Sequence, residues 1–437
     1  MTPSALDPRR PDRRSPADAV MSPPATGVFR SLRSFNYRLW AAGALVSNVG
    51  TWMQRTAQNW LVLAELTHQN ASAVGIVMAL QFGPQLLLLP WTGLAADRFN
   101  QRKLLFATQA TMGALALSLG ILTVAHLVAL WHVYVFAFLF GCAAAFDAPV
   151  RQTFVAELVG DADLSNAVAL NSTSFNAAQM VGPAVAGVTI AAIGDGWAFL
   201  LNGASFAAVL ISLSLLRACE LRPNARASRA KGGFAEGFRY VWSRPDLATM
   251  LIMLFLIGTF GLNFQIFIST MAVGVFHADA RGFGLLYSVM AIGTVSGALI
   301  AAGRSGVGFR TLLVGAAVFG LGCTLAAIAP GYWTFAAALV VIGAAALTFA
   351  NATNSLMQLS TEPQMRGRVM ALRVGVAFGG TPIGAPIVGW TADHFGPRWA
   401  LGIGAASGFA AAALAIRFLI AKSRRTPARP LAEPPFR

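Results

Sequence analysis

Five polar residues near the start of the chain have types and spacing that suit ligand binding. Asn48, Thr51, Arg55, Gln58 and Asn59 follow one another at intervals that put them on one face of a helix. They offer amide, hydroxyl and guanidinium groups. The guanidinium matters most, because its planar fork can bind an anionic or catechol-like group through two hydrogen bonds at once.

A long apolar segment must carry this face. Arg55 lies about 24 Å along a helix that begins at Leu39, and the next acid on the same helix, Glu65, is about 15 Å further on. An Arg at that depth costs several kcal/mol unless it meets water or a partner. We therefore expect the face to line a central cavity. The alternative is a polar contact between helices, which is common in membrane bundles.

Composition predicts that the whole chain is built this way. Apolar residues make up 56% of the 437 residues and charged residues only 11%, whereas soluble domains have about a quarter charged residues. Apolar runs of membrane-spanning length recur twelve times, which predicts an all-α membrane protein with twelve transmembrane helices. Their approximate limits are 39–64, 72–94, 103–125, 131–150, 164–192, 196–217, 246–275, 281–302, 309–328, 332–356, 366–393 and 398–420.

The basic residues predict orientation and domain limits. Of the 32 Lys and Arg, Arg55 lies inside a span and Arg281 and Arg398 lie in loops on one side; the others lie on the side of the termini or at helix ends there. Both termini are therefore predicted to be cytoplasmic, and the net charge of +15 reflects orientation, not nucleic-acid binding. The predicted parts are a disordered tail (1–30), a six-helix half (31–217), a cytoplasmic loop (218–245), a second six-helix half (246–420) and a tail (421–437).

The two halves repeat each other weakly. At a shift of 202 residues, Gly182 matches Gly384 and Gly187 matches Gly389. Duplicated halves around a site at the membrane midplane are a plan used by transporters. We therefore add polar residues of the fifth span and of the seventh span, the counterpart of the first. The predicted substrate cavity is formed by Asn48, Thr51, Arg55, Gln58, Asn176, Gln179, Asn263 and Gln265.

Asp147, near the end of the fourth span, has two interpretations. As a proton site, the buried carboxyl would be neutral for part of a transport cycle. As a gating latch, it would stay ionised beside Arg98, Arg102 or Arg151. Bases are abundant within reach along the sequence, which favours the latch.

The segment between the second and third spans, from Gly93 to Lys103, contains Asp97, Arg98 and Arg102. It resembles the loop G-x-x-x-D-R-x-G-R-K of the major facilitator superfamily, with Asn100 and Gln101 as departures. In that family the acid docks on the eleventh helix and locks the outward-facing form, and the resemblance implies this role for Asp97. The expected latch comprises Gly93, Asp97, Arg98, Arg102, Asp147 and Arg151.

A second resemblance concerns the fifth span, where Gly182 and Pro183 with Gly187 are similar to the antiporter signature g-x-x-x-G-P-x-x-G-G. Small residues there permit close helix packing. The stretches "SFNYRLWAAGALVSNVGTWMQRTAQNWLVLAELT", "GLAADRF" and "AFDAPVRQTFVAELV" are similar to the enterobactin-exporter-like subgroup. The resemblance implies a proton-driven exporter of siderophores or other amphipathic compounds in the bacterial inner membrane.

The sequence contains no pattern of residues that predicts enzyme activity. The 3 Cys are far apart, the 5 His fall at the non-cytoplasmic ends of spans, and no nucleophile–base pair or phosphate-binding loop is present. We expect no cofactor, no metal and no nucleic acid. The expected partners of this monomer are a small molecule, protons and the lipid bilayer. The predicted function is proton-coupled efflux by alternating access; a passive facilitator or channel, or a non-transporting membrane sensor, are the alternatives.

Overall fold

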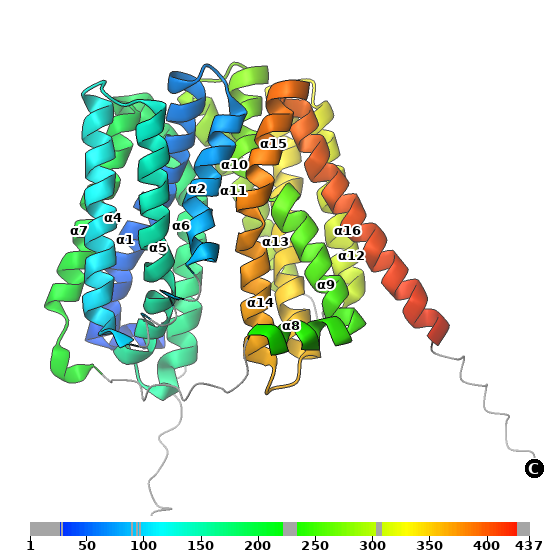
Figure 1. Ribbon diagram of the computed structural model, residues 1–437, viewed down its shortest axis with the longest axis horizontal. Helices are drawn as coiled ribbons and strands as arrows, with labels where there is room; N and C mark the ends of the chain where they lie inside the picture. The colour runs from blue at the N-terminus through cyan, green and yellow to red at the C-terminus, as the bar shows by residue number, and fades with distance from the viewer. Residues whose placement is uncertain are drawn as a thin grey trace, which may run out of the picture.

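The structure is a computed structural model of the chain. It describes residues 27, 29–88, 91–92, 95, 98–221, 234–302 and 308–425. All regular elements within these residues are helices, and they stand side by side in two groups (Figure 1). The first long helix begins at one end of the bundle, and the last long helix finishes at that same end. We call this the tail end, and the other the far end.

The first group contains the six helices predicted for the N-terminal half. A short 3-10 turn, η2 (Arg30–Arg33), precedes them. They are α1 (Phe35–Trp60, continued by the π-helical turn η3, Leu61–Leu66), α2 (Ala71–Leu87), α4 (Gln101–Val124), α5 (Leu130–Leu158), α6 (Asp161–Ile193) and α7 (Asp195–Leu215). Side chains fix several starting points, because Ser34, Asn70 and Asn100 each accept a hydrogen bond from a backbone N–H in the first turn.

The second group follows the same order with two interruptions. The seventh span is divided into α9 (Pro245–Leu256), η5 (Ile257–Gly261), α10 (Phe264–Thr270) and η6 (Met271–Val275), and the eleventh into α14 (Arg366–Gly379) and α15 (Thr381–Phe395). The remaining spans are α11 (Ala280–Ala302), α12 (Phe309–Ile328), α13 (Tyr332–Ser360) and α16 (Pro397–Arg425).

The predicted span limits agree closely with these helices, with three differences. The fourth span continues to Leu158, beyond the predicted limit at 150. The predicted loop 218–245 contains two short helices, η4 (Ala218–Glu220) and α8 (Phe234–Ser243). The predicted tail from 421 begins while α16 is still helical, whereas residues 1–26 of the first tail lie outside the described residues.

Ten of the described helical segments are long and apolar enough to cross a membrane. The other two spans depart from that pattern for visible reasons. α2 has only 17 described residues, and α1 is long enough but carries the polar face around Arg55. The arrangement therefore fits a twelve-span bundle.

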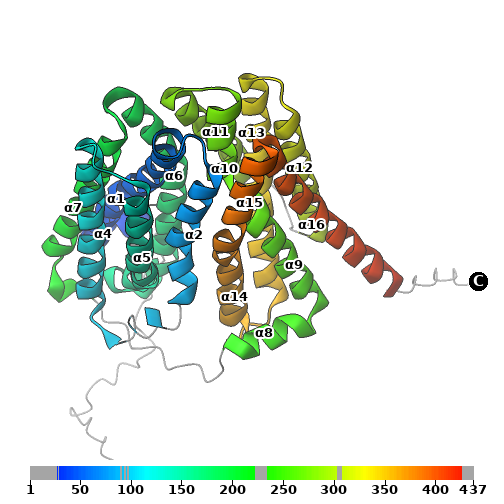
Figure 2. The same cartoon turned by 45° about the horizontal axis from the view of Figure 1, so that its top comes forward.

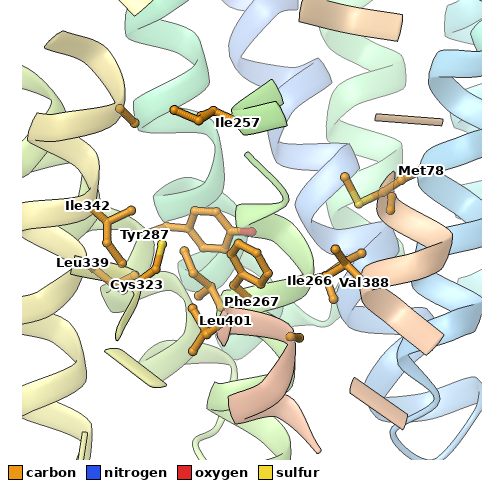
Figure 3. Packing of buried hydrophobic residues seen from close by; sticks show 14 of the residues in the cluster. Met78, Ile257, Ile266, Phe267, Tyr287, Cys323, Leu339, Ile342, Val388 and Leu401 are labelled. Atoms are coloured by element: carbon orange, nitrogen blue, oxygen red, sulfur yellow. The ribbon is translucent and has the colours of Figure 1, made fainter. Parts of the chain in front are cut away.

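The two halves are joined by a continuous apolar core. A single cluster of buried residues runs from α1 and α2 into the helices of the second half. Figure 3 shows Met78 of α2 opposite Val388 of α15, with Ile266 of α10 beside them. In Figures 1 and 2, α2 and α15 lie side by side toward the far end of the bundle.

Glycines make this junction tight. A Cβ on Gly187 of α6 would lie 2.4 Å from the Cα of Gly284 in α11, and one on Gly75 of α2 would lie 2.5 Å from the Ala385 carbonyl oxygen in α15. Only residues without a side chain let these backbones approach so closely. Because Gly187, Gly284 and Gly75 are all nearer the far end of their helices, the halves are closed against each other there.

Candidate functional site

Arg55 lies in the last two turns of α1 and is buried there, with 8% of the residue exposed. Its guanidinium carbon lies 4.9 Å from the ring centre of Trp52 and 4.8 Å from that of Phe82 on α2. The ring faces attract the positive charge, but they do not accept hydrogen bonds as a carboxylate would. Within the described residues the buried Nε has no hydrogen-bond partner, and no acid forms an ion pair with this side chain.

Asp147 is fully buried, with 0% exposure, and is saturated with donors. Arg151, one turn later on α5, donates to its Oδ2 at 2.5 Å. Gln109 and Thr108 of α4 donate to its Oδ1 at 2.7 Å and 3.0 Å. Charge-assisted bonds such as that from Arg151 are shorter and about twice as strong as hydrogen bonds between neutral groups.

The same cluster reaches α1, since a second nitrogen of Arg151 donates to Asn48 Oδ1 at 2.6 Å. All the hydrogen-bond partners of Asp147 and Arg151 described here therefore come from α1, α4 and α5 of the first half. Of the three bases considered for Asp147, the structure places Arg151 beside it. Asp147 neutralises Arg151, so within the part of the chain that the structure describes, Arg55 is the charge of this region that has no acid partner.

A pair of buried amides extends the polar face. Gln81 of α2 donates to Gln58 Oε1 at 2.9 Å, and Gln58 Nε2 lies 3.5 Å from the Val133 carbonyl oxygen. Sequence reasoning missed Gln81, although an amide in the middle of the apolar run 71–87 was a usable signal. Thr51, about one turn before Arg55, is half-buried.

The two predicted halves of the cavity meet at Asn59 and Gln265. Asn59 Nδ2 donates to Gln265 Oε1 at 2.9 Å. Asn263 is also buried, and its amide donates to the Thr259 carbonyl oxygen at 2.7 Å, just where the seventh span is interrupted. Three buried oxygens in this part of the described chain lack partners: Asn59 Oδ1, Asn263 Oδ1 and Thr259 Oγ1. A ligand with hydrogen-bond donors could satisfy them.

The polar and the packing residues of α6 have different surroundings. Asn176 and Gln179 are exposed, so the structure does not bury them with Arg55. Gly182, Pro183 and Gly187 are buried. A Cβ on Gly182 would lie 2.5 Å from the Trp52 Cβ of α1. The geometry therefore supports helix packing for this motif.

The charged segment between α2 and α4 is described only in part. Gly93 and Asp97 lie outside the described residues, and Arg98 is exposed. Arg102 donates from Nε to the Leu213 carbonyl oxygen at 2.9 Å and from Nη2 to that of Ser214 at 3.1 Å. These are terminal carbonyls of α7, so Arg102 caps a helix instead of pairing with Asp147.

Comparison with known proteins decides what kind of protein carries this arrangement. The family model described as a transmembrane secretion effector matches residues 20–436. The chain belongs to this family of the major facilitator superfamily. It is 26% identical over 58% of its length to the Staphyloferrin A transporter of Staphylococcus aureus, of which the match spans 63%. It is 26% identical to the multidrug efflux pump Tap of Mycolicibacterium fortuitum, over 81% of this chain and 88% of that one.

A solved structure supports the same fold. A bacterial homolog of the human lysosomal transporter Spinster, in an inward-facing and unoccupied conformation, superposes with a TM-score of 0.68 at 15% identity. The superposition covers 90% of this chain and 99% of the other. The family, its relatives and this neighbour are transporters, not enzymes, and this family member is a multi-pass membrane protein. The resemblance to the major facilitator superfamily and the predicted all-helical membrane fold of a transporter are thereby confirmed.

Proposed function

We propose that this family member is a secondary active exporter that moves a small amphipathic or anionic compound across the bacterial inner membrane by alternating access, coupled to protons. One observation carries the proposal. Among the described residues, Arg55 is a buried guanidinium with an unpartnered Nε and no acid in an ion pair with it, and the neighbouring charges of Asp147 and Arg151 neutralise each other. A cationic group held at that depth requires compensation, and a bound anion would supply it.

The surroundings of Arg55 support an amphipathic cargo. Trp52 and Phe82 cover the guanidinium with aromatic surface, whereas Gln58 and Gln81 offer amide groups nearby on the same two helices. An apolar wall with a few polar groups is the usual composition of a small-molecule site. The relatives named for a siderophore and for drugs agree with this chemical class.

In an alternating-access cycle, closure at the far end corresponds to a state that is open toward the tail end. The first described long helix begins at the tail end and the last one finishes there, and the distribution of bases predicts that this side faces the cytoplasm. The halves meet at the far end through Gly187 and Gly284, while Asn176 and Gln179, about two to three turns before Gly187 on α6, are exposed. These features support a state in which cargo enters from the cytoplasm.

Flux in inverted inner-membrane vesicles tests the proposal. Vesicles containing the protein are offered carboxylate siderophores, catecholate siderophores and cationic dyes, with and without a proton gradient. We expect accumulation of at least one anionic compound, abolished by a protonophore. Accumulation that ignores the protonophore would indicate a passive facilitator, and the absence of any flux would contradict transport.

A further inference from the structure

The side chain of Asp393 crosses from one half of the protein to the other at the far end. Asp393 lies in the last turn of α15, and its two oxygens accept hydrogen bonds from the backbone N–H groups of Ala71 and Ser72, at 2.6 Å and 2.7 Å. The Ser72 hydroxyl donates to the same carboxylate. Among the described residues, the only other side-chain hydrogen bond between the halves is that of Asn59 with Gln265.

These bonds complete the N-terminus of α2. The first N–H groups of a helix have no partner within it. In α2 the Asn70 side chain accepts from Ala73 N at 2.9 Å, and Asp393 takes the two N–H groups before it. The carboxylate therefore occupies a position that belongs to a capping residue, although it comes from another helix more than 300 residues later (Figure 1).

The partial charges at the two helix ends favour the docked position of Asp393. An acid in the last turn of a helix is repelled by the partial negative charge of that helix end. Asp393 is in this unfavourable position on α15. The partial positive charge at the N-terminus of α2 offsets the repulsion only while α15 and α2 are together. Separation at the far end would lose the bonds and restore the repulsion.

Two glycines beside Asp393 bring α15 and α2 into close contact. A Cβ on Gly389, one turn before Asp393, would lie 2.5 Å from the Ala71 carbonyl oxygen. One on Gly75, one turn after Ala71, would lie equally close to the Ala385 carbonyl oxygen. The two helices are antiparallel and in contact along this seam, so the Asp393 bonds form only when the seam is closed.

We propose that Asp393 is a latch that holds the outer gate shut, and that its release accompanies opening to the outside; this inference rests on the alternating access proposed above. The latch mirrors the one expected from Asp97. Asp97, which follows α2 in the sequence and lies outside the described residues, is expected from the family resemblance to dock on the eleventh span. Asp393, in the last turn of that span, docks on the start of α2 at the far end.

Distance measurements between the halves test the latch. Spin labels go on Leu127, between α4 and α5, and on Trp333, at the start of α13; both are exposed at the far end in opposite halves. The labels are placed in a variant in which Cys142, Cys219 and Cys323 are replaced. Asp393→Asn and Asp393→Ala should raise the ratio of long to short distances about tenfold, equivalent to about 1.4 kcal/mol.

Asp279 provides a matched control. It is also an exposed acid at the far end, and it accepts a hydrogen bond from Gly282 N at 2.8 Å, but within the second half. Asp279→Asn should leave the distances unchanged. Ala71→Pro tests the donor side independently, because it deletes one N–H at the first position of a helix, where proline is well tolerated. It should shift the ratio in the same direction as the Asp393 variants.

The outcomes separate the latch from the proposed function. An unchanged ratio in Asp393→Ala, or in Ala71→Pro if the Asp393 variants do not insert, would overturn the latch. So would an equal shift in Asp279→Asn. Flux measured in vesicles with the same variants is a separate readout. Normal export with unshifted distances would reject the latch alone, whereas a wild-type protein without flux would reject the exporter.

Discussion

Separating Asp147 from Arg151 should destabilise the first half of the bundle. Asp147→Ala would leave the Arg151 guanidinium without its carboxylate and the Gln109 amide without its acceptor. Arg151→Met would leave the carboxylate buried with only the two neutral donors. In the double variant neither charge remains, so its cost should be well below the sum of the two single costs.

The magnitude follows from burial. Breaking a buried ion pair by removing one partner costs about 3–5 kcal/mol. Because the Arg151 side chain is still 24% exposed, we expect the lower end, about 3 kcal/mol for each single variant. At about 2 °C per kcal/mol for a unit of this size, Asp147→Ala should lower Tm by about 6 °C. Non-additivity in the double variant should amount to about 2–3 kcal/mol.

Thermal unfolding of the detergent-solubilised protein, followed by tryptophan fluorescence, measures these shifts. The exposed pair of Arg217 with Glu220, at 3.0 Å, is a suitable control, since exposed pairs contribute about 1 kcal/mol or less. Glu220→Ala should lower Tm by about 2 °C at most. If Asp147→Ala lowered Tm no more than this control, or if the single effects added in the double variant, the conclusion that the buried Asp147–Arg151 pair stabilises the first half would be wrong.

Three other predictions concern topology, the gate and packing. Reporters fused to either terminus or within 218–245 should be cytoplasmic, and activity only outside the cytoplasm would reject the orientation. Asp97→Asn should reduce transport more than expression; effects that simply add to those of Asp147→Asn would show that the two acids do not share one latch. Gly187→Val should impair transport because its side chain would separate α6 from α11, whereas Gly331→Ala, with open space around its Cβ, should be neutral; equal effects would contradict the packing argument.

Hydropathy predicted the spans well because a membrane imposes a length on each apolar run. It could not predict the interruptions of the seventh and eleventh spans, since residues such as Gly379 and Gly380 leave the run apolar while α14 ends and α15 begins. It also missed α8, because this helix lies in a segment whose charges indicated a loop.

Local spacing predicted part of the site. The pairing of Asp147 with Arg151 is a contact at i, i+4 and was among the three that the sequence offered. The contacts of Arg55 with Phe82 and of Asp147 with Gln109 depend on how α1, α2, α4 and α5 pack, which no single segment encodes. The contact of Asp393 with the start of α2 likewise depends on packing, because the two segments lie more than 300 residues apart in the sequence.

Export of one anionic cargo by Arg55 variants tests the central claim most directly. The compound identified in the vesicle screen is offered to vesicles that contain the wild type, Arg55→Gln, Arg55→Lys or Arg398→Gln. Arg398→Gln is the control, because Arg398 donates to the Ala327 carbonyl oxygen at 2.8 Å, away from the site. We predict that Arg55→Gln abolishes export while the protein stays inserted. Arg55→Lys should restore it only partly, because a point charge lacks the planar fork, and Arg398→Gln should export normally. Export at the wild-type rate by Arg55→Gln would contradict the claim.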